Sequence, residues 1–170
     1  MSAWASNNPL RPAVTLRVAE LLGESTVVLS RKPATKDELI GDLVERLCAS
    51  LSISDPQALA AKVLEREHGI STTLDTGVSL PHARVDGLSR IAAAMAVIPG
   101  GLSDPASPDL PVRVVFLFFS PNSKEFYSAH LQLLRAVSSL LQPSLIESLE
   151  KASSSASVLE LLRGAEGAKK

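Results

Sequence analysis

Several residue types are scarce in this sequence, and each scarcity argues against a class of protein. Cys48 is the single cysteine in 170 residues, so an internal disulfide is excluded and a reducing compartment is favoured. Basic and acidic residues are nearly balanced, 17 against 18, and the basic ones are scattered, which argues against a nucleic-acid or anionic-membrane partner. No apolar run approaches the roughly 18 residues of a membrane span, and residues 1–14 lack a secretory pattern. These absences indicate a cytoplasmic protein without direct membrane insertion.

Aromatic residues are also few, at 4%, whereas 45% of the residues are hydrophobic. The core is therefore expected to be aliphatic. A chain of this length suits one domain, and no internal repeat or second core is visible. We expect a flexible tail over residues 1–13, one domain over residues 14–163 and a second tail over residues 164–170.

Apolar periodicity and capping signals predict helices in both halves of the chain. Thr35 and Glu38 form a capping box, and the apolar stripe of the helix that follows includes Cys48, which favours packing over chemistry for this thiol. Further helices are expected at 55–69, 128–142 and 143–151, and after a break at 153–155.

One strand is predicted before the first group of helices, and two longer ones between the two groups. They are expected at Thr26–Leu29, Ile91–Ile98 and Val112–Phe119, with a turn-rich surface loop over residues 99–111. The run Val112–Phe119 is apolar almost throughout, which is typical of a strand covered on both faces. The order of elements predicts a mixed sheet between layers of helices.

The stretch from Ser71 to Arg84 contains the candidate functional residue, His82. Pro81 fixes its own φ and favours an extended Leu80, so His82 is expected at a constrained strand end. A neutral imidazole, with a pKa of about 6.5 in model peptides, is a competent nucleophile near neutral pH. The hypothesis is that His82 accepts a phosphoryl group.

An ordered set of short motifs resembles the phosphotransferase-system enzyme IIA family of the fructose, mannitol and nitrogen-regulatory type (PTS EIIA type 2). The motifs are Arg66-Glu67, Ser71-Thr72, the run GVSLPHARV at 77–85, the strand VRVVFLFFSP at 112–121, and His130-Leu131. The similarity covers about residues 14–163. It implies an α/β fold (α+β in some schemes) with three α/β/α layers around a central mixed sheet.

The resemblance also implies a function and assigns residues to it. The domain is expected to take phosphate from phospho-HPr or a paralogue and to pass it to a IIB protein or signal to a regulatory target, with no cofactor and no metal. His82 corresponds to the phosphorylated histidine, His130 to a second active-site histidine, and Arg66 to the arginine of the Arg-Glu motif. The expected phosphate-binding residues are Arg66, His130, Ser71, Thr72 and Arg84. Phosphorylation adds about two negative charges, so such donors must converge on the site.

The sequence departs from the family pattern after Ser-Thr. Thr73-Leu74-Asp75 stand where many members carry glycines, which is expected to reshape the backbone donors around the phosphate. Asp75 is expected to add repulsion near phospho-His82 unless it points away.

Four other interpretations stay open. A metal site made of His82, His130 and Glu67 has no recognised ligand spacing, and a Ser/His/Asp hydrolase lacks its Gly-x-Ser-x-Gly elbow. A regulatory binding module with weak transfer activity, or a sugar-specific IIA that serves a IIB protein, uses the same histidine. Because the sequence has no IIB or IIC segment, a free-standing IIA of the nitrogen-regulatory type is favoured.

Two further expectations concern surface residues. His82 is expected in a shallow depression, with Phe126 and Tyr127 forming part of the surface on which a phospho-donor docks. The alternative is that these two aromatic residues cover the sheet edge. His68 is expected to be exposed and without a role.

Overall fold

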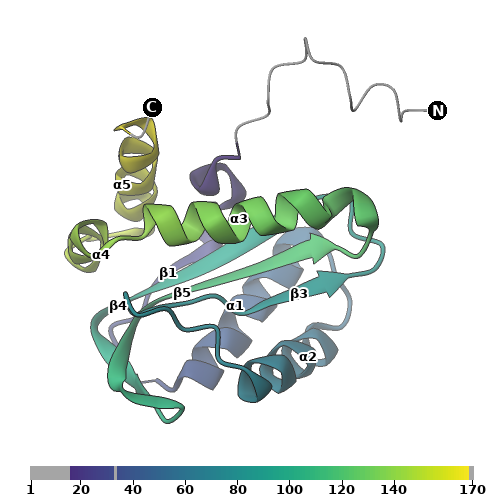
Figure 1. Cartoon of the computed structure of the whole chain (residues 1–170), viewed down its shortest axis with the longest axis horizontal. Coiled ribbons are helices and arrows are strands. Elements are labelled where there is room, and N and C mark those ends of the chain that lie inside the picture. Colours follow the sequence, from purple (N-terminus) through teal and green to yellow (C-terminus); the bar gives the residue numbers. More distant parts are fainter. Residues whose placement is uncertain (1–15, 33, 169–170) are drawn as a thin grey trace.

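The computed structural model describes residues 16–32 and 34–168 (Figure 1). The tail expected over residues 1–13 lies outside this part of the chain. In chain order the elements are the short 3-10 helices η2 (Val18–Leu21) and η3 (Glu24–Thr26), strand β1 (Val27–Leu29), helices α1 (Lys36–Leu51) and α2 (Pro56–Gly69), strands β2 (Val78–Ser79), β3 (His82–Val85), β4 (Ala92–Asp104) and β5 (Ser107–Pro121), the 3-10 helix η4 (Lys124–Phe126), and helices α3 (Tyr127–Leu140), α4 (Pro143–Glu150) and α5 (Ser155–Ala168).

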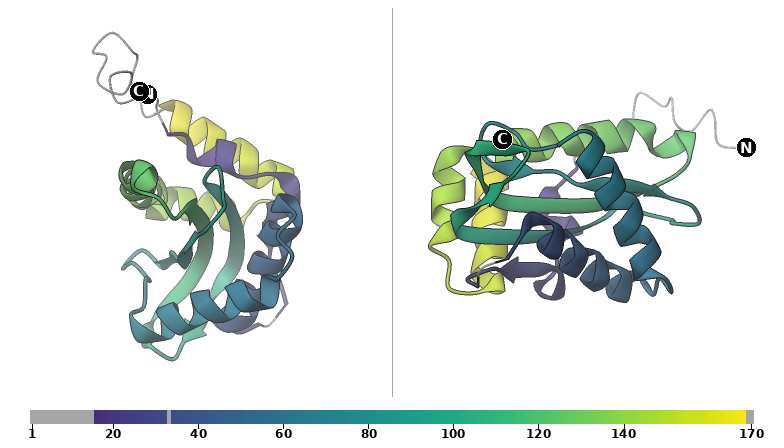
Figure 2. Two further views of the ribbon diagram at one scale, coloured as in Figure 1. Left: turned by 90° about the vertical axis from the view of Figure 1, so that its right-hand side faces the viewer. Right: turned by 90° about the horizontal axis from the view of Figure 1, so that it is seen from below.

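The strands form one mixed sheet in the order β1-β4-β5-β2, with β3 also paired to β5. β4 and β5 are antiparallel, β1 is parallel to β4, and both β2 and β3 are parallel to β5. Figure 2 shows α3 on one side of the strands and α1 and α2 on the other. The predicted α/β/α arrangement around a mixed sheet is confirmed.

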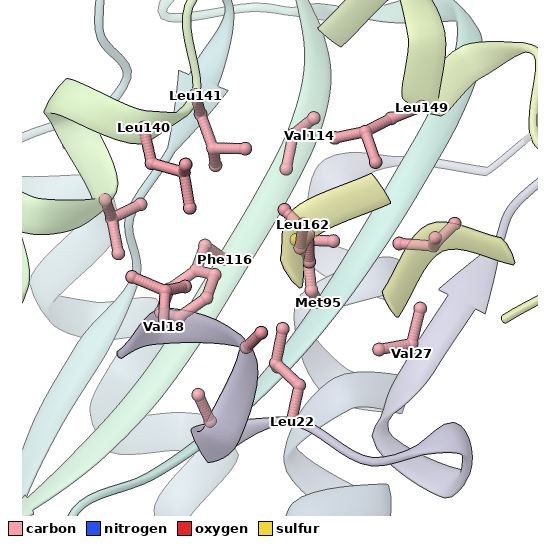
Figure 3. Packing of buried hydrophobic residues seen from close by; sticks show 14 of the residues in the cluster. Val18, Leu22, Val27, Met95, Val114, Phe116, Leu140, Leu141, Leu149 and Leu162 are labelled. Atoms are coloured by element: carbon pink, nitrogen blue, oxygen red, sulfur yellow. The ribbon is translucent and has the colours of Figure 1, made fainter. Parts of the chain in front are cut away.

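Successive side chains of β4 and β5 point to opposite faces of the sheet, so the core has one part on each face. Met95, Val114 and Phe116 face the side covered by α3, α4 and α5, where Leu140, Leu149 and Leu162 pack on them (Figure 3). Ala94, Val115 and Leu117 face α1 and α2. The predicted strand from Val112 to Phe119 is thus covered on both faces, as its continuous apolar sequence indicated.

The loop predicted over residues 99–111 is wrong. β4 continues to Asp104 and β5 begins at Ser107, so the two strands form a long hairpin whose register shifts between Val97 and Leu102. Gly100 and Gly101, with φ of +82° and +74°, take the left-handed conformations of an irregular step in the ladder. The glycines bend the hairpin and do not end it.

A tail was expected over residues 164–170, but α5 extends past residue 163 to Ala168. The carboxylate of Glu166 accepts hydrogen bonds from the N–H groups of Val18 and Ala19, at 2.7 and 2.8 Å. These contacts fix the last turns of α5 against η2. None of the helices in the described ranges has the length and apolar character needed to cross a bilayer.

Candidate functional site

His82 is the first residue of β3 and lies beside Phe118 of β5. Its ring stacks on the Phe118 ring with centroids 5.0 Å apart and planes 10° apart. His82 Nδ1 lies 2.8 Å from the carbonyl oxygen of Leu80. Because a carbonyl only accepts hydrogen bonds, the proton of the neutral ring is on Nδ1 and the lone pair is on Nε2. The ring nitrogen of His82 with a free lone pair is therefore Nε2.

His130 of α3 completes a cluster of three rings. Its centroid lies 5.1 Å from that of His82, with planes 71° apart, and 5.1 Å from that of Phe118. Its Nδ1 lies 2.6 Å from Ser120 Oγ, near the end of β5. Both histidines are 8% exposed. The sequence prediction that His82 and His130 share a site agrees with their placement.

The electrostatic surroundings favour the neutral form of both rings. Burial lowers the pKa of His82 below its ordinary value, and the positive charge of Arg66 lowers it further, against opposing effects of the Leu80 carbonyl and Glu67. Burial, His82, Arg84 and Arg66 together lower the pKa of His130 to about 4. Neutral imidazoles can attack or donate a hydrogen bond at physiological pH.

A depression of about 490 Å³ lies over His82. It is lined by Lys62, Glu65, Arg66, His82, Ala83, Arg84 and Asn122. Within residues 16–32 and 34–168, the guanidinium of Arg66 has no hydrogen-bond or ion-pair partner. Arg66 therefore supplies an uncommitted fork of donors close to both histidines.

Arg84 lines the same depression but is held more firmly. Its Nη2 donates to the carbonyl oxygens of Pro121 (3.4 Å) and Ser123 (3.0 Å), and its guanidinium lies 4.0 Å above the Tyr127 ring. Arg84 Nε is buried and has no hydrogen-bond partner in the described part of the chain. One donor of this residue is thus unused.

Ser71 and Thr72 do not line this depression. The Thr72 hydroxyl donates to Glu67 Oε2 at 2.7 Å and accepts from the Leu80 N–H at 3.1 Å. The Ser71 hydroxyl donates to Thr73 Oγ1 at 3.2 Å. Asp75 is exposed on the turn before β2 and is also absent from the lining. The depression therefore joins His82 with Arg66 and Arg84, and His130 reaches the site through its ring contact with His82, whereas the Ser-Thr pair is not part of the lining.

A buried ionic cluster, formed by Lys36, Glu67 and Asp104, was missed by the sequence analysis. Lys36 Nζ lies 2.7 Å from Glu67 Oε1 and 3.0 Å from Asp104 Oδ2, and the three side chains are 7%, 3% and 6% exposed. The available signal was a lysine in the first turn of α1, where the helix dipole disfavours a cation.

Glu67 is committed to this cluster, which argues against a metal site with the histidines. No group of three or more His, Cys, Asp or Glu in the described residues is arranged to hold a metal ion.

The residues expected at the docking surface separate into two groups. Phe126 is half-buried and packs against the core on the α3 side of the sheet. Tyr127 is 56% exposed, and Leu131, one turn further along α3, is 63% exposed.

His68 is exposed and lies 2.8 Å from Asp37. Cys48 is buried as a free thiol, as its place in the apolar stripe predicted.

Comparison with known proteins identifies the family. The family described as "Phosphoenolpyruvate-dependent sugar phosphotransferase system, EIIA 2" matches residues 20–165. The chain belongs to this family. Its members are phosphoryl carriers of the phosphotransferase system, so the resemblance seen in the Pro-His and Arg-Glu motifs is confirmed.

Relatives of the chain are sugar-specific and nitrogen-regulatory. It is 31% identical to the "PTS system fructose-specific EIIA component" of Haloferax volcanii, over 80% of this chain and 88% of that protein. It spans only 20–22% of the length of three other curated relatives, which are multi-component EIIABC or EIICBA proteins, and 80% of the "Nitrogen regulatory protein" of Pseudomonas aeruginosa, to which it is 21% identical.

Two solved structures have the same fold. Nitrogen regulatory protein IIA-Ntr from Neisseria meningitidis superposes with a TM-score of 0.72 at 26% identity, over 85% of this chain and 98% of that chain. Enzyme IIAMTL from Escherichia coli, solved in complex with phosphorylated enzyme IIBMTL, gives a TM-score of 0.67 at 26% identity, over 84% and 97% of the two chains.

Proposed function

We propose that this EIIA domain carries a phosphoryl group on Nε2 of His82, received from phospho-HPr or a paralogue of HPr. The observation that carries the proposal is the 2.8 Å contact between His82 Nδ1 and the Leu80 carbonyl. It commits the Nδ1 proton to the backbone and leaves Nε2 as the only ring nitrogen with a free lone pair. Phe118 holds the plane of the ring by stacking.

The transfer is a displacement at phosphorus. The Nε2 lone pair forms the new N–P bond while the bond from phosphorus to the donor imidazole breaks, and the donor nitrogen keeps that electron pair. The Nδ1 proton of His82 stays hydrogen bonded to Leu80. This chemistry depends on alignment and on stabilisation of the phosphoryl charge more than on covalent catalysis.

Arg66, His130 and Arg84 stabilise the phosphoryl charge in this proposal. Arg66 has an uncommitted guanidinium beside the depression, and Arg84 has a buried Nε without an acceptor. A phosphoryl oxygen is a suitable acceptor for both. We assign Thr72 a different role from the phosphate contact predicted from the sequence, because its hydroxyl already bonds Glu67 and Leu80. Thr72 positions the residue that orients His82, and Ser71 supports this turn through Thr73.

Two downstream roles are compatible with this site. We favour a nitrogen-regulatory IIA, which is supported by the similarity to the Neisseria IIA-Ntr structure. A sugar-specific IIA that passes phosphate to a IIB protein is the second candidate, and the fructose-specific relative favours it. We propose that the protein acts in the cytoplasm, the reducing compartment that its single free thiol favours. Transfer from the phosphorylated protein to a fructose-type IIB distinguishes the two roles.

Labelling with phosphoenolpyruvate, enzyme I and HPr tests the central proposal. The wild type should take up an acid-labile, base-stable phosphate, and His82→Ala should take up none. His68→Ala is the matched control and should label at the wild-type rate, because His68 lies outside the depression. Wild-type labelling of His82→Ala would contradict the assignment.

A further inference from the structure

Ser120 makes a hydrogen bond to the second histidine for which the sequence analysis gave no role. Ser120 is fully buried near the end of β5, and its Oγ lies 2.6 Å from His130 Nδ1. This is at the short end of the range for such bonds. The serine directly follows the apolar run at 114–119, so its hydroxyl is a polar group in an apolar part of β5.

The direction of this hydrogen bond follows from the partners available to each group. Within the described part of the chain, Ser120 Oγ has no hydrogen-bond partner besides His130. If His130 donated through Nδ1–H, the buried serine proton would have no acceptor, which is a costly arrangement. If Ser120 donates to the Nδ1 lone pair, the serine proton is satisfied. A neutral His130 then has its own proton on Nε2.

We propose that Ser120 is a positioning residue that holds His130 in the tautomer with the proton on Nε2, so that His130 donates to the phosphoryl group on His82. This inference rests on the proposed function of His82, and it adds a residue to which neither the family match nor the sequence assigned a role.

The two histidines are then held in opposite tautomers by opposite partners. His82 Nδ1 faces a carbonyl, which only accepts, so its proton stays on Nδ1 and Nε2 is free to attack. His130 Nδ1 faces a hydroxyl that donates, so its Nε2 has the proton. The two histidines therefore present one lone pair, on His82 Nε2, and one N–H group, on His130 Nε2.

This arrangement also explains why one histidine, and not both, accepts phosphate. A lone pair on His130 Nε2 would repel the phosphoryl oxygens and would be a second nucleophile close to the first. A proton on that atom removes both effects. Burial supports the neutral state that the arrangement requires, because it is the main cause that lowers the pKa of His130 to about 4.

Long-range ¹H–¹⁵N spectra of the unphosphorylated protein, labelled on histidine nitrogens, test the tautomers directly. The wild type should have protonated Nε2 and unprotonated Nδ1 at His130, and the reverse at His82. Ser120→Ala should give a mixture of tautomers at His130 and leave His82 unchanged, whereas Ser120→Thr should restore the wild-type pattern. A proton on His130 Nδ1 in the wild type overturns the proposal, whether or not the variants fold.

Phosphorylation kinetics supply the second readout. Ser120→Ala should slow labelling of His82 by about threefold to tenfold with an unchanged KM for phospho-HPr, because only molecules with the correct tautomer are competent. Ser138→Ala is the matched control, since its hydroxyl bonds the Leu134 carbonyl on the same helix. Wild-type kinetics and an unaltered tautomer in Ser120→Ala overturn the role of Ser120 while the function of His82 stands. Absence of labelling in the wild type would overturn the proposed function, and the spectra would still decide the tautomer.

Discussion

The consecutive residues Arg66 and Glu67 of α2 belong to two different polar clusters. Glu67 enters the buried ionic cluster with Lys36 and Asp104, in which both carboxylates lie within 3.0 Å of the ammonium group. Arg66 faces the depression over His82 and has no side-chain partner in the described residues. In the first cluster each charged group has a partner of opposite charge, whereas the Arg66 guanidinium in the second has none among the described residues. Complete pairing indicates a structural role, and the unused donors support the phosphate site proposed beside His82.

The two clusters are joined by a chain of hydrogen bonds. Glu67 accepts from the Thr72 hydroxyl, which accepts from the Leu80 N–H, and the Leu80 carbonyl accepts from His82 Nδ1. The ionic cluster therefore helps to hold Leu80, the residue whose carbonyl selects the tautomer of His82. The difference between the clusters predicts that one set of substitutions affects stability and another affects transfer.

Lys36→Met should give the largest effect, which is a loss of stability. Removal of the ammonium leaves two buried carboxylates without a counter-charge, and breaking a buried pair costs about 3–5 kcal/mol. Urea denaturation of the variant and the wild type measures the loss. A midpoint within error of the wild type would show that the cluster is not a structural support.

Arg66→Ala should give the opposite result. Loss of one oriented donor slows transfer by about a hundredfold to a thousandfold, whereas the free energy of unfolding should change by less than about 0.5 kcal/mol, as for exposed residues. Single-turnover labelling and urea denaturation of the same preparation separate the two effects. A destabilised variant with a normal transfer rate would remove the distinction between the neighbouring residues.

The pH dependence of stability sharpens the comparison further. The pKa of folded His130 is lowered from 6.5 to about 4, so the unfolded chain binds more protons between these values. Stability is therefore highest above pH 6.5 and falls as the pH drops toward about 4. In His130→Gln the fall over this window should be smaller. Denaturation midpoints measured across the window test this, and equal slopes in the two proteins would contradict a buried neutral His130.

The smallest effects are expected on the surface of α3. Tyr127→Ser should raise the KM for phospho-HPr by a few-fold with little change in thermal midpoint, because Tyr127 is exposed and holds Arg84 by a cation–π contact worth about 0.5–1 kcal/mol. Phe126→Ser is the paired variant and should lower the thermal midpoint, since Phe126 packs on the core. The reverse pattern would exclude Tyr127 from the docking surface.

The sequence was sufficient to predict the layers of the fold and the central residues of the site. Continuous burial of Val112–Phe119 and the apolar stripe of α1 follow directly from local pattern. His82, His130 and Arg66 were predicted from contiguous, ordered motifs, and the structure places His130 against His82 and Arg66 beside it. The hairpin over residues 99–111 was predicted as a loop because its glycines and prolines are turn signals. Residues of β4 nevertheless pair with Val112 and Ser107 of β5, so the ladder continues through this segment.

The roles of Ser120, Thr72 and Lys36 depend on contacts between different elements of the fold. Lys36 meets Asp104 across 68 positions, and Ser120 meets His130 from a different element. No local pattern reports such contacts. Thr72 was predicted to bind phosphate from its place in a motif, whereas its hydroxyl bonds Glu67 and Leu80.

The atom that carries phosphate is the most direct test of this account. Protein labelled with ¹⁵N on histidine and phosphorylated through HPr should show phosphorus–nitrogen coupling at Nε2 of residue 82, with the proton kept on Nδ1 and donated to the Leu80 carbonyl. Coupling at Nδ1 of His82, or at either nitrogen of His130, would contradict the claim that the backbone selects the nucleophile.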